Sequence, residues 1–449
     1  MESPFVSGLL DGTFHLLGEV APPALEDSLQ EIDALAQGIA ADYAHDGLFY
    51  GLVVDDNPDD LERQDVQDFA AVLEHHFPRH VIRMFSGKGR APRENHVWLQ
   101  RMSHEKPDGV FCAVSGDARP LEKSYVDSVE SLRLCREEGL GGLTGGATVN
   151  IGKYTAPDIA ISYAKMGRKL TCGAKFLLCQ ATWDVRKAQE LQWELQMRGA
   201  PVPVIARVLW FSSEEVEKLP AVLPPGVLLP ELYQRGLKIE YAKGLKEGRA
   251  YQSRCLALLM TGLRRLGFCG ALLHGDVTPI DIQTLTTAFQ KALAECPDYN
   301  SWRNRWKGEM EKIMLPPVAS PRYLFANLMK LNHRDPSGVE FEPTSPLDPG
   351  KAPFGDRLVS RLLRTADDPA KPLALRHALC KICGVNPNVL FRLVHLGYLP
   401  NDRCPKRLTE GACGNVGPKG QCECRNRLCF FRRVLALAAA QGRLDEWAR

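Results

Sequence analysis

The C-terminal end of the chain carries thiols at a spacing that suits a metal site. Five cysteines fall within 26 residues, at Cys404, Cys413, Cys422, Cys424 and Cys429. Gly411, Gly414, Gly417 and Gly420 lie between them, and glycines permit the tight turns that point several thiolates at one centre. The stretch has few apolar side chains for a core, so metal binding would supply its folding free energy. Zinc is the default ion, and an iron–sulfur cluster is the alternative, because thiolates alone do not separate the two.

A second thiol pair, Cys380-Lys-Ile-Cys383, lies upstream, so seven of the chain's 14 cysteines fall in the last 70 residues. These two cysteines could complete a second site with Cys424, which could equally replace a ligand of the first site or stay idle. Disulfides are the other interpretation of the whole set. They are rare in cytosolic proteins, which the rest of this chain resembles.

A different group of polar residues closes short apolar runs in the first 280 residues. The run ends are Glu19, Asp55-Asp56-Asn57-Pro58, Ser115-Gly116-Asp117, Gln180 and His274-Gly275-Asp276. A carboxylate such as Glu19 inside an apolar run is costly unless it is paired or used in chemistry. Structural roles are also open: Asp56 and Asp117 suit helix or turn caps, Gln180 could satisfy backbone groups, and Glu19 could form an ion pair inside a barrel.

The elements that would position these residues alternate along the chain. Eight β-prone runs are separated by stretches with helical spacing. The runs are His15–Ala21, Leu48–Val54, His80–Phe85, Gly109–Ser115, Leu140–Val149, Lys175–Gln180, Val202–Trp210 and Cys269–His274. Such alternation implies parallel strands, and eight strands within about 275 residues predict a (β/α)8 TIM barrel over residues 1–295. An open doubly wound sheet is the alternative.

Beyond the barrel, residues 296–370 combine helical patterns with turn-rich stretches, which predicts a helical connector and linker. Residues 371–449 form the predicted cysteine-rich metal-binding domain, closed by an amphipathic helix at Arg433–Glu446. The formal net charge of +2 indicates neither nucleic-acid nor membrane binding. The absence of a signal-peptide pattern or a long apolar run predicts a cytoplasmic protein without a membrane span.

Four motifs in the tail resemble a known family. Cys404-Pro-Lys-Arg-Leu, Gly411-Ala-Cys-Gly-Asn-Val, Gly420-Gln-Cys-Glu and Cys429-Phe-Phe resemble the cysteine-rich C-terminal domain associated with methylenetetrahydrofolate reductases. The resemblance covers roughly residues 376–447. It implies that one metal is held by Cys404, Cys413, Cys422 and Cys429.

The barrel motifs resemble the same family over about residues 15–290. The motifs are Glu19 before Pro22-Pro23, Val54-Asp55-Asp56-Asn57-Pro58, Ser115-Gly116-Asp117, and Cys172-Gly-Ala-Lys-Phe176 through Gln180. The resemblance implies that Glu19 is the general acid at the folate nitrogens. It also implies that Asp117 holds the pterin and tunes a flavin, and that Gln180 contacts both.

The chain departs from the family where the flavin is expected. The third strand, Val81-Ile-Arg-Met-Phe-Ser86, has no His at its end, and the fifth has no aromatic residue followed by a His. We expect the contacts of a flavin, FAD or FMN, at Asn57, Gly146, Thr148 and Lys153. Glycines there would admit a ring or phosphate and Lys153 would meet a phosphate. A bulge with a surface lysine fits the same residues.

The resemblance implies an oxidoreductase that interconverts 5,10-methylene- and 5-methyl-tetrahydrofolate in one-carbon metabolism. NAD(P)H or an electron-donor protein would supply the electrons. The alternative is a folate-binding or scaffold protein that lacks flavin and whose metal domain docks a redox partner.

Overall fold

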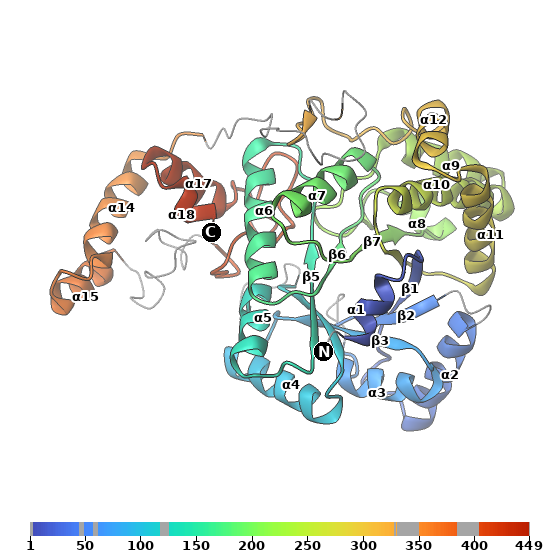
Figure 1. Ribbon diagram of the computed structural model, residues 1–449, viewed down its shortest axis with the longest axis horizontal. Coiled ribbons are helices and arrows are strands. Elements are labelled where there is room, and N and C mark those ends of the chain that lie inside the picture. The colour runs from blue at the N-terminus through green and yellow to red at the C-terminus, as the bar shows by residue number, and fades with distance from the viewer. Residues whose placement is uncertain are drawn as a thin grey trace.

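A computed structural model gives the fold and describes residues 3–44, 49–56, 62–116, 125–326, 329, 350–383 and 404–448. Eight parallel strands form a closed barrel in sequence order (Figure 1). The strands are β1 His15–Val20, β2 Phe49–Val54, β3 His80–Ser86, β4 Val110–Val114, β5 Thr144–Val149, β6 Phe176–Cys179, β7 Val204–Leu209 and β8 Gly270–His274. The predicted TIM barrel is therefore confirmed, and the open sheet is excluded.

Helices surround the barrel, and most begin at a capping residue that the sequence provides. Asp65 caps α3 through the Gln67 amide, and Thr155 caps α6 through the Asp158 amide. The layer consists of α2 Leu29–Ala44, α3 Val66–His76, α4 Pro92–Glu105, α5 Ser128–Glu137, α6 Ala156–Thr171, α7 Val185–Met197, α8 Ser213–Lys218, α9 Glu231–Lys243, α10 Leu245–Arg265 and α11 Pro279–Glu295. In the part of the chain that the structure describes, none of the helices is both long enough and apolar enough to cross a membrane.

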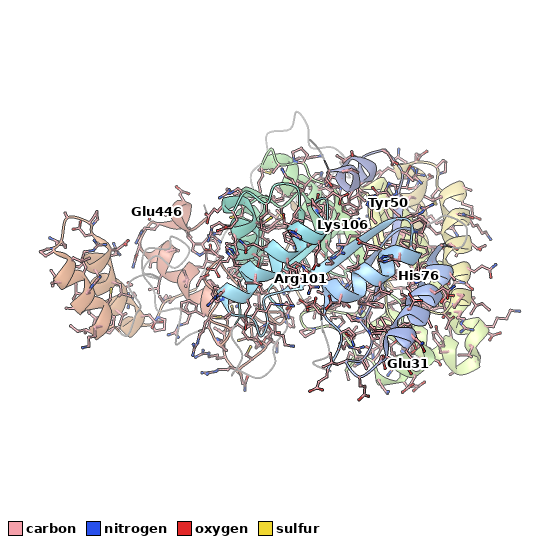
Figure 2. The ribbon with its side chains drawn as sticks, turned by 90° about the horizontal axis from the view of Figure 1, so that it is seen from below. Glu31, Tyr50, His76, Arg101, Lys106 and Glu446 are labelled. Atoms are coloured by element: carbon pink, nitrogen blue, oxygen red, sulfur yellow. The ribbon has the colours of Figure 1, made fainter. Side chains whose placement is uncertain are left out.

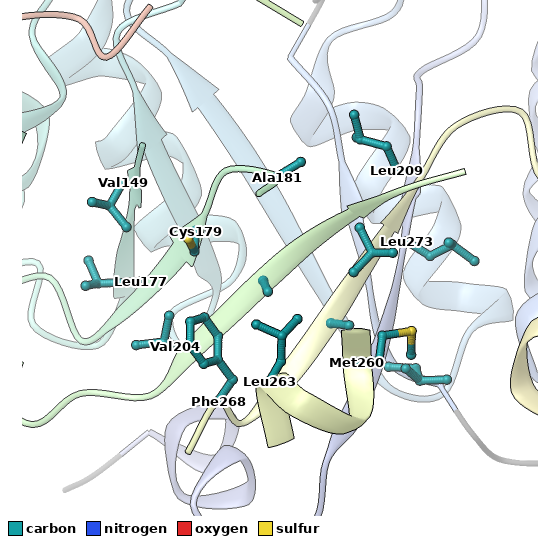
Figure 3. Close-up of a cluster of buried hydrophobic side chains, with 14 of the residues drawn as sticks. Val149, Leu177, Cys179, Ala181, Val204, Leu209, Met260, Leu263, Phe268 and Leu273 are labelled. Atoms are coloured by element: carbon teal, nitrogen blue, oxygen red, sulfur yellow. The ribbon is translucent and has the colours of Figure 1, made fainter. Parts of the chain in front are cut away.

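Two apolar layers follow from the alternation of side chains along each strand. Outward-facing residues such as Val149, Leu177 and Leu273 pack against the helices (Figure 3). Inward-facing residues fill the barrel. They are Leu17, Val53, Ile82, Met84, Val110, Cys112, Phe176, Leu178, Ile205 and Leu272. The N-terminal helix α1, Pro4–Leu9, adds Phe5, Val6 and Leu9 to this inner cluster, so it plugs the end of the barrel where the strands begin.

After α11, the chain forms α12 (Tyr299–Glu309) and later a pair of helices, α14 (Phe354–Asp367) and α15 (Leu373–Ile382). The α14–α15 pair stands away from the barrel at one end of the molecule (Figures 1 and 2). Cys380 packs there against Leu363 and Ala366 of α14. Because this thiol is part of a small apolar cluster, packing accounts for its burial.

The tail docks on the barrel through α6. Ile161 and Ala164 of α6 share an apolar cluster with the tail. The tail side chains in this cluster include Leu408, Val416, Phe430, Phe431, Val434, Leu435, Leu437 and Trp447. The predicted single closing helix is wrong: α17 (Phe430–Ala440) and α18 (Leu444–Ala448) are separate. Gly442, with φ of 66°, adopts the left-handed conformation that ends a helix between them.

Candidate functional site at the barrel mouth

A cavity of about 450 Å³ opens at the ends of the strands, where TIM barrels carry their active sites. Its lining comes from two parts of the chain that are far apart in sequence. Strand ends and α6 supply most of it, including Asp55, Thr148, Gln180, Arg207 and His274. Residues 222–225, between α8 and α9, also line it, and the tail supplies the loop Ala412, Cys413, Gly414, Asn415 and Val416. The thiol-bearing loop is thus a wall of the barrel cavity.

Glu19 is paired with a residue that sequence reasoning missed. Its side chain is 2% exposed, and the Arg207 guanidinium donates to both carboxylate oxygens, with Nε 2.8 Å from Oε2. His274 Nδ1 lies 3.0 Å from the same Oε2, and Arg207 Nη2 lies 3.8 Å from Asp55 Oδ1. The suggestion that Glu19 forms an ion pair inside the barrel is therefore confirmed. A bidentate guanidinium holds the carboxylate as an anion.

The four residues Glu19, Asp55, Arg207 and His274 come from four strands that are neighbours around the barrel. Burial, together with the nearby charge of Arg207, lowers the pKa of His274 to about 4, so the ring is neutral at pH 7. Donor atoms of Glu19, Asp55 and His274 lie within 4.8 Å of one another, a spacing that a cation would need. Arg207 supplies the positive charge at this position, so the group is an ion-pair network.

The other strand-end carboxylate of β2 has a structural role. Asp56 accepts from the Ser86 amide at 2.8 Å and pairs with the Arg90 guanidinium. It therefore ties the loop after β2 to the end of β3, a tertiary contact in place of the helix or turn cap that the sequence suggested. Asp117 and Asn57, expected to hold the pterin and the cofactor, lie outside the described residues.

Gln180 and Thr148 both line the cavity, in the positions that the sequence predicted for a ligand contact. The Gln180 side-chain oxygen accepts from the Ala181 amide at 3.0 Å. Its amide nitrogen has no partner in the part of the chain that the structure describes, so it can donate to a ligand. Their binding roles remain predictions.

Gly146 and Lys153 differ from expectation. Gly146 lies outside the cavity lining, deep in the barrel, where an added Cβ would stand 2.1 Å from the Phe176 ring. The glycine makes room for that ring, not for a cofactor. Lys153 lines the cavity, but the residue is only 5% exposed and its ammonium donates to the Val416 carbonyl of the tail at 2.7 Å. It is neither a surface lysine nor a free phosphate ligand.

Two lysines of α6 also line the cavity and were missed by sequence reasoning. Lys165 Nζ pairs with buried Asp127 at 2.8 Å and donates to the Gly411 carbonyl at 3.2 Å. Lys169 Nζ donates to the Thr148 carbonyl at 2.6 Å. Burial lowers the pKa of Lys169 to about 8. Within the described chain no carboxylate lies at ion-pair distance from Lys169. Asp127, which pairs with Lys165, acts on it from farther away, so an anion in the cavity would add counter-charge.

The tail thiols are neighbours, but not at metal-ligand spacing. Burial raises the pKa of Cys413 to about 12, and burial with Cys413, Cys404 and Cys422 nearby raises that of Cys429. A hydrogen bond from Cys424 lowers the pKa of Cys422 to about 6. Among the described residues, no three of these thiols lie within 4.8 Å of one another. The four-thiolate site therefore stays a prediction.

A buried ion pair links the thiol loop to the barrel. Lys406 pairs with Glu423, with side chains 2% and 6% exposed, and also donates to the Gly116 carbonyl after β4 at 2.8 Å. Glu423 in turn accepts from Cys413 Sγ at 3.1 Å and from Asn415 at 2.9 Å. The network joins a candidate metal ligand to the strand end that precedes Asp117.

Comparison with known proteins identifies the tail. Residues 370–449 match the family model described as the methylenetetrahydrofolate reductase C terminal. The motif-based prediction for the tail is thereby confirmed. In the protein an eight-stranded parallel barrel precedes the segment that matches this family model, and a loop of that segment forms part of the barrel cavity. No curated protein matches the chain significantly.

Solved structures align with the barrel at low identity. An uncharacterized protein from Clostridium thermocellum that binds two copies of 5-methyl-5,6,7,8-tetrahydrofolic acid is 16% identical and has a TM-score of 0.48. The alignment covers 64% of this chain and 99% of that protein. A putative lyase/mutase from Burkholderia cenocepacia J2315 is 13% identical with a TM-score of 0.34, over 69% of this chain and 96% of its own.

Proposed function

We propose that the protein binds a reduced folate in the barrel mouth and interconverts 5,10-methylene- and 5-methyl-tetrahydrofolate. One observation carries this proposal. The loop Ala412–Val416 belongs to a methylenetetrahydrofolate reductase C-terminal domain and is also a wall of the barrel cavity. A domain of this family would have little reason to close a cavity unrelated to the family's substrate. The cavity volume, about 450 Å³, lies in the range of small-molecule sites.

The polar groups of the cavity suit a pterin. One edge of the pterin ring carries an amide and an amino group, which donate and accept side by side. Asp55 can accept from it, Arg207 can donate to it, and the Gln180 amide can do both. Glu19 is paired with Arg207 and is not among the described residues that line the cavity. Asp55, Arg207 and Gln180 come from different strand ends, so a flat ring lying across the mouth can reach several of them at once.

Glu19 is the proposed general acid, and its pairing sets a condition on that role. While Arg207 holds both oxygens, Glu19 remains a carboxylate and can only accept. Proton donation to a folate nitrogen therefore requires that the ligand draw Arg207 away. His274, 3.0 Å from Glu19, is the side chain placed to exchange a proton with it.

A flavin is the proposed hydride carrier, and the α6 side of the cavity fits its phosphate part. A bound flavin would supply the hydride at its ring. Lys169 offers a buried ammonium that has a carbonyl but no carboxylate partner in the described chain, and Thr148 lies beside it. Gly146 and Lys153 are left out of the proposed flavin contacts. The Phe176 ring fills the space beside Gly146, and the Lys153 ammonium is bonded to the Val416 carbonyl.

The tail thiols Cys404, Cys413, Cys422 and Cys429 are proposed to hold one zinc ion or iron–sulfur cluster. The chemistry of the four side chains suits such a metal, because all are sulfur donors on one turn-rich segment. Their charges also affect one another's ionisation. The bound metal would fix the loop that walls the cavity. Elemental analysis of anaerobically purified protein should find zinc or iron, with less of it in Cys413→Ala. Finding neither metal in wild type would contradict the assignment.

A folate-binding protein without flavin is the second candidate, favoured by the contact of Lys153 with the tail. The visible absorption spectrum of the purified protein separates the two, because flavin bands support the reductase and their absence supports the binder.

Calorimetric titration with 5-methyl-tetrahydrofolate tests the folate site itself. Gln180→Ala should weaken binding by about 1–3 kcal/mol, because pterin groups lose their partner. Gln283→Ala, an exposed glutamine on α11, is the matched control and should leave affinity unchanged. Absence of binding by wild type, or equal affinity of both variants, would refute the proposed site.

A further inference from the structure

A second hollow lies beside the first, where the tail meets α6. It is a groove of about 470 Å³. Three segments line it: the start of α6, the connector before α14, and the tail. The lining residues are Thr155, Ala156, Pro157, Arg322, Gly350, Lys351, Pro353, Lys419, Leu428, Arg432, Arg433 and Ala436. An ion pair separates the two hollows. It joins Asp158, which lines the barrel cavity, to Arg432, which lines the groove.

The charge of this groove is one-sided. Of the described residues that line it, five are Arg or Lys and none is Asp or Glu. Arg432 is neutralised by Asp158 and Arg433 by Asp356. Arg322, Lys351 and Lys419 have no carboxylate partner in the part of the chain that the structure describes. Three cations without a carboxylate partner among the described residues therefore face a single concave surface.

The start of α6 does not account for this charge. Thr155 already caps the helix, and Asp158 in the first turn already compensates its positive end. The rest of the lining is small or apolar and includes Ala156, Pro157 and Pro353. A ligand in the groove would thus meet guanidinium and ammonium groups together with apolar surface.

We propose that this groove is a binding site for a small ligand that carries two or three negative charges, as phosphates or carboxylates. The volume matches pockets for small molecules, and the concave shape distinguishes it from a flat docking surface for an acidic protein. Arg322 can hold a phosphate or carboxylate with two parallel hydrogen bonds, while Lys351 and Lys419 act as point charges. The site does not depend on what the barrel cavity binds.

The proposal is tested by calorimetry at low salt with two probes. Inorganic pyrophosphate carries its charge as phosphates and tri-γ-glutamate as carboxylates, so the two probes distinguish these ligand classes. Wild type should bind at least one probe, more weakly as salt rises. The triple variant Arg322→Gln, Lys351→Gln, Lys419→Gln should bind it about tenfold or more weakly, since each exposed ion pair contributes up to about fivefold.

The matched control removes the same charge elsewhere. Arg93→Gln, Lys246→Gln and Lys291→Gln change exposed residues of α4, α10 and α11, and affinity should stay within about twofold. If the triple variant folds poorly, a second measurement on wild type replaces it. The bound probe should protect Lys351 and Lys419 from chemical acetylation, which mass spectrometry detects. Binding of neither probe, equal loss in both triple variants, or no protection would overturn the proposal.

Discussion

The two ends of the barrel obey the same alternation of side chains and hold opposite contents. At the end where the strands begin, Phe5 and Leu9 of α1 meet an apolar interior. At the other end, Glu19 of β1 and Arg207 of β7 occupy inward positions, two residues after Leu17 and Ile205. Apolar contacts satisfy the first end without partners, whereas charges at the second end need each other. Apolar packing and charge pairing are therefore separated along the barrel axis.

Breaking the charged end should have the largest effect. Glu19→Gln is expected to lower turnover between the two folates by about 10²–10⁴-fold, because a positioned acid is lost. It also leaves Arg207 without its carboxylate, so stability should fall as well. Steady-state rates with an artificial electron acceptor check this, with exposed Glu26→Gln as control. A rate near wild type would remove Glu19 from the mechanism.

Breaking the apolar end should cost stability and leave the mouth intact. Phe5 is 1% exposed and packs against the Phe176 ring, 5.1 Å between centroids. Phe5→Ala should lower the free energy of unfolding by about 3–5 kcal/mol, measured by denaturant titration, without changing folate affinity of the folded protein. Leu10→Ala, 55% exposed at the end of the same helix, is the control. A large loss of affinity in folded Phe5→Ala would show that the ends are not separate.

A pH dependence should reveal the buried lysine of the mouth, Lys169. Burial lowers the pKa of Lys169 to about 8 from 10.5, so between these values the unfolded chain binds more protons than the folded one. Stability should therefore rise with pH across this window, by about 1–3 kcal/mol. Lys169→Met should lack this part of the rise, and the difference between the two unfolding curves isolates it. Parallel curves would contradict the assignment.

The smallest expected effect concerns the closure of the charged end by the tail. Asn150 Nδ2 donates to the Gly414 carbonyl at 2.9 Å. Asn150→Ala should destabilise tail docking by about 1 kcal/mol, seen as faster proteolysis of the tail. Asn300→Ala, exposed on α12, is the control. Equal cleavage rates in all three proteins would mean that this bond does not hold the loop.

Local patterns were enough to predict the barrel, because each strand is a short apolar run between helical repeats. They failed where a glycine sets the backbone conformation. The fifth strand was expected to begin at Leu140, but Leu140–Leu143 forms a turn after Gly139, whose φ is 68°. Arg207 was missed because it lies inside a strand and not at its end. Its signal was a lone charge in the apolar run Val204–Leu209, at an inward position two residues after Ile205.

The arrangement of tail and mouth could not be predicted from local pattern. Lys153 has the same sequence context whether it meets a phosphate, the solvent or the Val416 carbonyl. Only the fold brings residues 263 positions apart into contact. The tail motif was recognisable because its cysteine spacing is specific, while its docking on α6 depends on an apolar helix face that any barrel helix could present.

The wide sequence separation of these contacts has a consequence for synthesis. The last strand ends at His274, and the contact from Lys406 to the Gly116 carbonyl joins residues 290 apart. At about 5–20 residues per second, the ribosome needs roughly 10–35 s to add the 175 residues from 275 to 449. For that interval the nascent barrel has all its strands but an unsealed mouth, and the apolar patch of Ile161 and Ala164 is bare. The tail wall of the cavity thus forms only after residues 404–448 have been synthesised and have folded back on α6.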